Sequence, residues 1–284
     1  TYIVKTDSNG NEVWTVEYVS YYGYSIIQSL DDNYVIAGFS HSDTYDFWLL
    51  KFDTDGNTIF EETYGGTWTD LAWDMRSTSD GGFILVGETN SYGNGNDDVY
   101  LIKTDVNGIE QWSQTFGGSD FDKGYAIVQT VDNGFIIGGS SHSYGDGSED
   151  GWIIKVDSEG NLEWDEIFGG GLEDRIRSVS VTNDNGFIVS GFTSSYGNGS
   201  ADVWLIRYEG TGDAPYNGPT WYVSTSGSDS NDGSEESPFA TIQAGIDAAS
   251  DGDTVLVTAG TYVENINYNG KDIVVGSLML TTQD

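Results

Sequence analysis

The chain has 284 residues, of which 37% are hydrophobic, so it can fold as one large β domain or two smaller ones with a real core. Its formal net charge of −36 disfavours nucleic acids and anionic membranes as partners, because like charges repel. The absence of cysteine excludes disulfides and thiolate metal sites, and no apolar run reaches the roughly 18 residues that a membrane-spanning helix needs.

A block of residues repeats along the first 209 positions, with a step of 52 residues from Asp46 to Asp202 and a shorter first interval of 46 residues from Lys5 to Lys51. Each copy has an aspartate two positions before an aromatic residue, then a strand that carries a cation, a DxxG turn and a strand that carries a second aromatic residue. The aspartate and the positive-φ glycine of the turn predict a hairpin. The repeat positions are Asp46, Asp98, Asp150 and Asp202, then Lys51, Lys103, Lys155 and Arg207, and then Trp14, Phe60, Trp112 and Trp164.

Two further strands follow in each copy, after a Gly-Gly pair. The second of them has the form "DNGFIIGG", as at Asp132. Four short strands in about 50 residues are typical of β-propeller blades, whereas a β-sandwich imposes no fixed period. We therefore predict an all-β propeller in which four to five blades are represented: the last two strands of one blade, three complete blades and three strands of another. Further blades are expected upstream, and ring closure stays open.

The combined pattern, DGGF…G…D.WL.K.D..G…W…GG, resembles the propeller repeats of large bacterial extracellular proteins. The resemblance covers Thr1 to Glu209. It implies an extracellular or cell-surface location, and most members of that group have no assigned activity. The DxxGxxxW portion is also similar to the tryptophan-docking motif of quinoprotein propellers, in which the Trp packs between neighbouring blades. Nothing in this sequence supplies their quinone site.

The pattern changes after Glu209. Residues 210–220, "GTGDAPYNGPT", are predicted to be a linker because they are rich in Gly and Pro. In the segment 221–284, Ser237 followed by Pro238 predicts the start of a helix. Ile242, Ile246 and Ala249 would share one face of it. Three strands are predicted beyond the helix, at Thr254 to Thr258, Val263 to Tyr268 and Ile273 to Val275.

This segment is similar to the N-terminal cap of right-handed parallel β-helices of the pectate-lyase-like class. The elements "WYVSTSGSD", "SPFATIQAGIDAA", "DGDTVLV" and "GTYVE" carry the resemblance. It implies a short capping helix and about one coil of a β-helix. Catalytic residues of that class lie on later coils, so no catalytic residue is transferred to this chain.

Two repeated features are candidate binding sites. The first is a row of aspartates four residues after each Gly-Gly pair, which are either turn and capping residues or a ring of carboxylates that binds calcium or sugar hydroxyls. The second is a Gly-, Asn- and Asp-rich loop with one Tyr in each copy, which is either a polar connection or a calcium loop. The aspartates are Asp70, Asp122 and Asp174, and the loops begin at Ser91, Ser143 and Ser195.

The recurring cation at Lys51 and its equivalents, with Lys5 in the first copy, is expected to pair with a repeat carboxylate or with backbone carbonyls. An unpaired buried charge would be costly. His41 and His142 are the only histidines. They lie in "SHS" segments without nearby ligands of a zinc site, so surface-loop residues are expected.

These features favour a non-catalytic structural or binding module of a large secreted or cell-surface protein, with a role in adhesion or in contact with matrix, a glycan or another surface protein. Calcium is the one cofactor hypothesis. The alternative is an accessory propeller and the front end of a polysaccharide-degrading β-helix enzyme whose catalytic coils lie beyond residue 284. Further domains of the same chain are expected on both sides.

Overall fold

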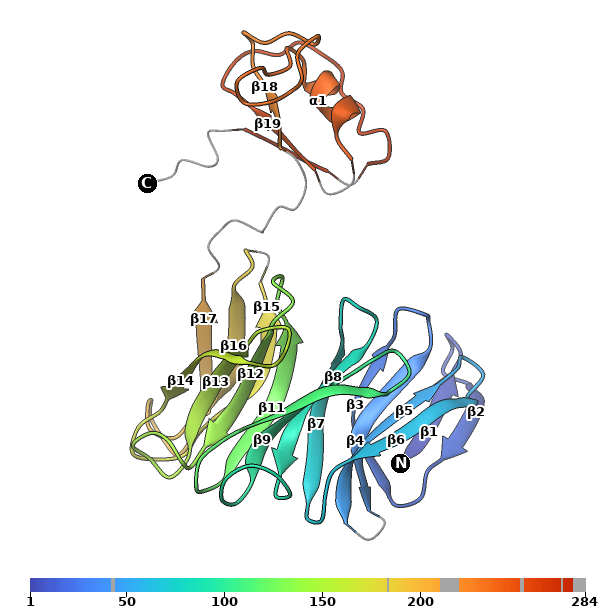
Figure 1. The fold of residues 1–284 in the computed structure, drawn as a ribbon, viewed down its shortest axis with the longest axis vertical. Coiled ribbons are helices and arrows are strands. Elements are labelled where there is room, and N and C mark those ends of the chain that lie inside the picture. Colours follow the sequence, from blue (N-terminus) through green and yellow to red (C-terminus); the bar gives the residue numbers. More distant parts are fainter. Residues whose placement is uncertain (42–43, 183, 210–219, 251–252, 272, 278–284) are drawn as a thin grey trace. The chain divides into compact units, whose positions relative to one another are not determined.

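The computed structural model describes residues 1–284 except 42–43, 183, 210–219, 251–252, 272 and 278–284. It is almost entirely β structure (Figure 1). Two compact units, Thr1–Gly212 and Asp213–Asp284, divide the chain, and each is described by itself. The predicted linker lies outside the described residues except for Thr220.

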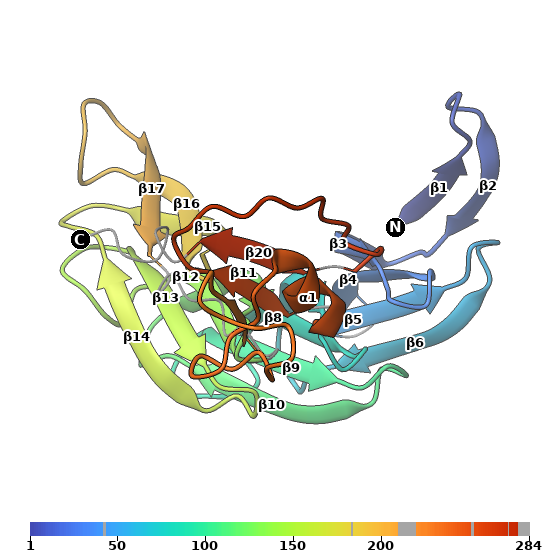
Figure 2. The same ribbon diagram turned by 90° about the horizontal axis from the view of Figure 1, so that it is seen from above.

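The first unit contains three complete four-stranded antiparallel sheets, each built from consecutive strands. We call them blade 1 (β3–β6), blade 2 (β7–β10) and blade 3 (β11–β14). They are preceded by a two-stranded hairpin blade (β1–β2) and followed by a three-stranded open blade (β15–β17), which confirms the predicted four strands per repeat. Figure 2 shows the blades following one another in chain order. The strands are β1 (Tyr2–Thr6), β2 (Glu12–Glu17), β3 (Tyr21–Gln28), β4 (Tyr34–His41), β5 (Tyr45–Phe52), β6 (Thr58–Tyr64), β7 (Asp70–Ser77), β8 (Phe83–Thr89), β9 (Asp98–Thr104), β10 (Glu110–Phe116), β11 (Asp122–Gln129), β12 (Phe135–Ser141), β13 (Asp150–Val156), β14 (Leu162–Phe168), β15 (Asp174–Val181), β16 (Phe187–Thr193) and β17 (Asp202–Tyr208).

A bulge in the first strand of each blade explains the last glycine of the DGGFILVG motif. In blade 2 the register between β7 and β8 shifts between Ala72 and Asp74. The shift brings the backbone close to the second strand, so a Cβ on Gly87 would lie 1.9 Å from the Leu71 carbonyl oxygen. Only a residue without a side chain fits there.

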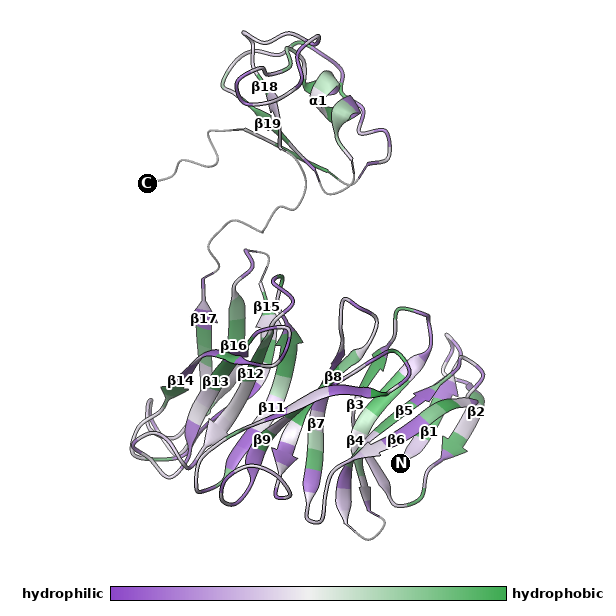
Figure 3. Ribbon diagram, in the orientation of Figure 1, coloured by the Kyte–Doolittle hydropathy of each residue, from purple (hydrophilic) through white to green (hydrophobic). Residues whose placement is uncertain are grey.

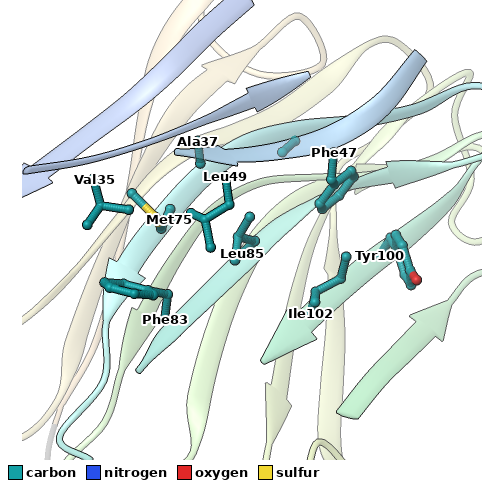
Figure 4. Close-up of a cluster of buried hydrophobic side chains, with 10 residues drawn as sticks. Val35, Ala37, Phe47, Leu49, Met75, Phe83, Leu85, Tyr100 and Ile102 are labelled. Atoms are coloured by element: carbon teal, nitrogen blue, oxygen red, sulfur yellow. The ribbon is translucent and has the colours of Figure 1, made fainter. Parts of the chain in front are cut away.

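The core lies between successive blades. Strands β8 and β9 are buried along their whole length, because each has a blade on either side. Figure 4 shows one junction, where side chains of blade 1 meet side chains of blade 2. Hydrophobic stretches along strands such as β11 and β16 supply these contacts (Figure 3). The junction in Figure 4 contains Val35, Ala37, Phe47, Leu49, Met75, Phe83, Leu85, Tyr100 and Ile102.

The aromatic residues of the fourth strands β2, β6 and β10 pack on the DxxG turn of the next blade. Trp14 donates from Nε1 to the carbonyl of Thr54 at 3.0 Å. A Cβ on Gly56, which has positive φ, would lie 3.1 Å from the Trp14 ring. Phe60 is placed in the same way on Gly108. This arrangement agrees with the tryptophan-docking resemblance, and it gives Gly56, Gly108 and Gly160 a second reason to lack a side chain.

In the second unit, β18 (Thr220–Val223), β19 (Thr254–Val257) and β20 (Val274–Ser277) form a parallel sheet in that order. The strand predicted at Thr254 is confirmed, and β20 begins one residue after the predicted start at Ile273. No strand forms over Val263 to Tyr268, so that prediction is wrong. Its residue Glu264 instead accepts hydrogen bonds from the N–H groups of Ile242 and Gln243, at 2.9 Å each, at the start of the helix.

The helix α1 (Ile242–Ala248) starts later than predicted. Thr241 is its N-cap, and the Thr241 hydroxyl accepts from the N–H of Ala244. Ser237 and Pro238 cannot begin it, because Phe239 is held to β18 by a hydrogen bond to the Tyr222 carbonyl at 2.9 Å. The predicted helical face is confirmed, since Ile246 is buried in the core of this unit. No helix in the described ranges is long and apolar enough to cross a membrane.

Candidate functional site at the blade junctions

The three junctions that follow blade 1 have the same polar corner. The Gly-Gly connector leads from the fourth strand of one blade to the first strand of the next. A loop of the form SYGxG, between the second and third strands, reaches this connector. We describe the corner between blades 2 and 3, because its 52-residue equivalents repeat the same contacts.

Asp122, the first residue of β11, holds the connector and the loop together. Its Oδ2 accepts from the N–H of Gly118 at 2.8 Å and from the Ser143 hydroxyl at 2.6 Å. Its Oδ1 accepts from the Ser141 hydroxyl and from the N–H of Ser143. The equivalent Asp70 and Asp174 make the same kinds of contact, and all three carboxylates are buried. They therefore act as organisers of the corner.

Asp98, the first residue of β9, faces the same connector from the preceding blade. It is 1% exposed. Its Oδ2 accepts from the N–H of Asn94 at 2.7 Å, whereas its Oδ1 has no hydrogen-bond partner among the described residues. A Cβ on Gly117 would lie 1.8 Å from this free oxygen and 2.8 Å from Asp122 Oδ2. The two carboxylates thus flank one point, which only glycine leaves free.

The free oxygen recurs at the junctions on either side of this one. Asp46 Oδ1 and Asp150 Oδ1 are likewise buried without a partner in the part of the chain that the structure describes. A Cβ on Gly65 would meet the carboxylates of Asp46 and Asp70, and a Cβ on Gly169 would meet those of Asp150 and Asp174. Sequence analysis found both rows of aspartates by their 52-residue step but did not pair them.

The pKa of Asp98 and of Asp150, in one row, is raised, whereas the pKa of Asp174, in the other row, is lowered. Burial, and then the neighbouring carboxylates of Asp122 and Asp97, raise the pKa of Asp98 to about 6, against the effect of the Asn94 N–H. Burial and the carboxylate of Asp174 also raise the pKa of Asp150. Burial alone would raise the pKa of Asp174, but hydrogen bonds from Ser195, Thr193 and the connector backbone lower it below its ordinary value. The Asp98 carboxyl, with a pKa of about 6, therefore keeps its proton in mildly acidic solution.

The tyrosine of each loop lies on the outside of this corner. Tyr92, Tyr144 and Tyr196 each donate from the hydroxyl to the carbonyl of the first connector glycine, at 2.7, 3.0 and 2.6 Å. Their rings stay partly exposed. Beside them the connectors present Trp68, which is 63% exposed, and Phe121. Sequence analysis treated the loops as polar connections or calcium loops and missed this row of aromatic rings, although the repeated Ser-Tyr-Gly was the signal for it.

The recurring cations pair as expected, at the other end of the blades. Each amino or guanidinium group meets the aspartate that opens the turn before the second strand. Lys51 and Lys103 are buried, with Nζ 2.8 Å from a carboxylate oxygen. Lys5 differs, since its Nζ donates to the Thr54 carbonyl at 2.6 Å. The pairs are Lys51 with Asp31, Lys103 with Asp80, Lys155 with Asp132 and Arg207 with Asp184.

Neither histidine ring has a hydrogen bond to a junction carboxylate among the described residues. His41 stacks on Tyr45 with 4.4 Å between ring centroids, and His142 lies 6.0 Å from Phe121. Within the described ranges, no three His, Asp or Glu side chains gather as a multidentate metal site. The calcium hypothesis for Asp70, Asp122 and Asp174 stays a prediction. A cation there would have to replace hydrogen bonds from serine hydroxyls and backbone N–H groups.

Comparisons with known proteins are confined to the fold and to one short segment. Residues 225–269, in the second unit, match the family described as "Protein of unknown function (DUF1565)". The curated proteins contain no match to the chain.

Similar solved structures include a protein of unknown function from Bacteroides caccae (9% identity, TM-score 0.44, 66% of this chain and 64% of that one). A eukaryotic initiation factor has 9% identity and a TM-score of 0.38, with 72% and 46% of the two chains covered. A protein described provisionally as an exo-β-1,3-galactanase from Bifidobacterium bifidum has 14% identity and a TM-score of 0.40, with 72% of each chain covered. This chain spans less than two thirds of the first two. At these scores the likenesses assign no activity, and the chain is established as a nearly all-β protein with propeller-like repeats and a C-terminal parallel sheet that is similar, over residues 225–269, to the DUF1565 family.

Proposed function

We propose that the first unit is a non-catalytic binding and structural module of a secreted or cell-surface protein, and that it binds glycans through the junction rim. The rim consists of the exposed aromatic rings of the loops and connectors: Trp68, Tyr92, Phe121, Tyr144 and Tyr196. One observation carries the proposal, which is that the tyrosine rings recur at the same corner of successive blades and are fixed there by hydrogen bonds.

Such a rim suits a carbohydrate chain. Aromatic faces stack on the apolar faces of sugar rings, and fixed polar groups between them bond the hydroxyls. Asn96 and Asp120, both exposed, lie near the rim and supply such groups. Successive corners would contact successive sugar units, because the repeat presents the same chemistry at each blade. Rings held rigidly in advance lose little conformational freedom on binding.

The junction carboxylates support a binding role over a catalytic one. Glycoside hydrolysis by a carboxylate pair requires both groups to flank the scissile bond. Asp98 and Asp122 are close together, but both are buried beneath the connector and the loop. Both carboxylate oxygens of Asp122 also accept internal hydrogen bonds. Substrate would have no access to them without opening the junction.

The extracellular location rests on the resemblance of the repeats to those of bacterial extracellular proteins and on the strongly acidic composition. For the second unit we propose the N-terminal cap of a pectate-lyase-like β-helix. The parallel, in-register pairing of β18 with β19 and of β19 with β20 favours it. This keeps a second candidate function open, in which the propeller is the accessory module of a polysaccharide-degrading enzyme.

Affinity electrophoresis of the full chain through a panel of soluble polysaccharides tests the binding function. We expect at least one polysaccharide to retard the chain. Trp68→Ala or Tyr144→Ala should weaken this binding about tenfold, because an aromatic side chain that a ligand covers often contributes most of the binding energy. Val131→Ala is the matched control, because Val131 is exposed in the turn between β11 and β12, away from the connectors and loops. Equal mobility of all variants would reject the rim as the binding surface. Polysaccharide hydrolysis that one Asp substitution abolishes would reject the non-catalytic role.

A further inference from the structure

Blade 2 contains a hollow of about 330 Å³ between its tyrosine loop and its fourth strand, β10. Part of its wall is aromatic, and the rest carries one carboxylate, one amide and two hydroxyl groups. A ring face combined with a few polar groups is typical of sites for small polar ligands, whereas empty cavities in proteins are apolar. The hollow is lined by Tyr92, Tyr100, Glu110, Ser113, Gln114 and Thr115.

The neighbouring blades fill the corresponding place with an indole and a carboxylate. At the 52-residue step, blades 1 and 3 have a tryptophan where blade 2 has Tyr100, and an acidic residue where blade 2 has Ser113. In blade 3 the Nε1 of Trp152 donates to Oδ2 of Asp165 at 2.9 Å, and the equivalent pair of blade 1 makes the same contact. The open space in blade 2 therefore goes with a smaller ring and a serine at these two positions.

The polar character of the hollow continues along β10. Glu110 and Thr115 stand where blade 3 has Leu162 and Ile167. Blade 3 forms the same four-stranded sheet with these apolar residues, so the fold does not require the polar ones. The difference between the two blades is therefore one of surface chemistry rather than of architecture.

The groups that face the hollow are fixed in place and free to bond. The Tyr92 hydroxyl donates to the Gly65 carbonyl at 2.7 Å, and the ring centroids of Tyr92 and Tyr100 lie 5.5 Å apart. Burial raises the pKa of Tyr100 to about 12, so its hydroxyl keeps its proton at neutral pH. The Gln114 amide and the Thr115 hydroxyl form no hydrogen bond within the described residues.

We propose that this hollow is a subsite for one neutral hexose unit, an inference that rests on the glycan-binding function proposed for the rim. The partly exposed ring of Tyr92 stacks on the apolar face of the sugar, and the Glu110 carboxylate accepts hydrogen bonds from its hydroxyl groups. An acidic sugar is disfavoured, because Glu110 is the one ionised group of the lining and the chain has a formal net charge of −36.

Proton–nitrogen correlation spectra of the full chain, recorded while glucose, galactose or mannose is added, test the proposal. We expect at least one hexose to shift the amide signals of residues 110–115 in a saturable manner. The equivalent residues 162–167 of β14 are the internal control and should not respond. No response at residues 110–115 to any of the three sugars, or an equal response at residues 162–167, overturns the subsite. A stronger response to glucuronate or glucosamine overturns its assignment to a neutral sugar.

Two variants connect the response to the hollow. Tyr100→Trp combined with Ser113→Asp gives blade 2 the pair that fills this place in blade 3, so this chain should fold and lose the response. Glu110→Gln, an exposed substitution, serves if urea titration shows that the double variant is unstable. It should weaken hexose binding about fivefold, because hydrogen bonds to a charged acceptor are stronger than those to a neutral one. An unchanged response in either folded variant overturns the proposal.

Failure of the subsite and failure of the rim give different results. If a polysaccharide retards the chain but no hexose shifts residues 110–115, the rim stands and the subsite is rejected. If a hexose shifts residues 110–115 but no polysaccharide retards the chain, the rim is rejected and the hollow stands as a site for a free sugar.

Discussion

Leu101 and Leu205 occupy the same repeat position, in blade 2 and in the open blade, yet their surroundings differ completely. Leu101 is fully buried in the junction with blade 3, whereas Leu205 is 64% exposed. Val99 and Val203 differ in the same way. Both residues lie on the third strand of a blade, but among the described residues β17 has neither a fourth strand beside it nor a following blade, so the difference comes from these neighbours. Each blade of this repeat therefore contributes one face to each of two hydrophobic cores, and its stability depends on the blades that stack on either side.

Truncation of these two leucines should give the largest difference in the free energy of unfolding. Leu101→Ala leaves a cavity in a closed junction, so we expect a loss of about 3 kcal/mol in the free energy of unfolding. Leu205→Ala removes atoms that already contact water and should cost less than about 0.5 kcal/mol. Urea titrations followed by tryptophan fluorescence measure both. Equal losses would show that the outer face of the open blade is covered in solution.

The polar corner should be sensitive to a single methyl group. Gly117→Ala would place a Cβ between the Asp98 and Asp122 carboxylates, and we expect a loss of about 2 kcal/mol from this overpacking. Gly171→Ala is the matched control, because a Cβ there meets nothing within 4 Å. The same titrations apply. If both variants were equally stable, the connector would be free to move away from the carboxylates.

Replacing Asp98, the carboxyl whose pKa is raised, should change the free energy of unfolding less, and should stabilise the fold. A carboxyl with a higher pKa in the folded state, here Asp98 at about 6, keeps its proton on folding, so stability falls as pH rises from about 4 to about 6. Asp98→Asn removes that ionisation and places an amide donor beside Asp122. We expect it to be about 1 kcal/mol more stable than the parent chain at pH 7 and nearly equal at pH 4.

The control for this pH dependence is Asp55→Asn, an exposed turn residue away from the junction carboxylates. It should keep the parent's slope between pH 4 and 6. If the free energies of unfolding of Asp98→Asn and of the parent chain changed with pH in parallel, the assignment of the slope to the junction carboxyl would be contradicted.

Asp174 has the opposite shift. Its pKa is lowered in the folded state, so it adds stability above about pH 4 that is lost on further acidification.

The blade architecture could be predicted because the 52-residue copies contain no insertions. Every strand, turn glycine and cation then recurs in register, and three independent copies outweigh local ambiguity. The pairing of Asp98 with Asp122 could not be predicted. The two residues belong to different blades, and only the stacking of the blades decides which carboxylates meet.

The second unit had no repeat to correct local signals. Ser237 and Pro238 look like a helix start, but the backbone beyond them bonds to β18, and Thr241 caps the helix instead. Val263 to Tyr268 reads as a strand by composition. Its acidic residue, Glu264, caps the helix by a tertiary contact that sequence spacing alone does not reveal.

Calcium should have the smallest effect of all, which separates a hydrogen-bonded corner from a cation site. A site present at ten times its Kd would add about 1.4 kcal/mol and raise the thermal midpoint by about 3 °C. Both oxygens of Asp122 already accept hydrogen bonds, so we expect midpoints in chelator and in excess calcium that agree within about 1 °C. Magnesium at equal concentration controls for general screening of the acidic surface. A rise specific to calcium that Asp122→Asn abolishes would contradict this expectation and assign the row of Asp70, Asp122 and Asp174 to cation binding.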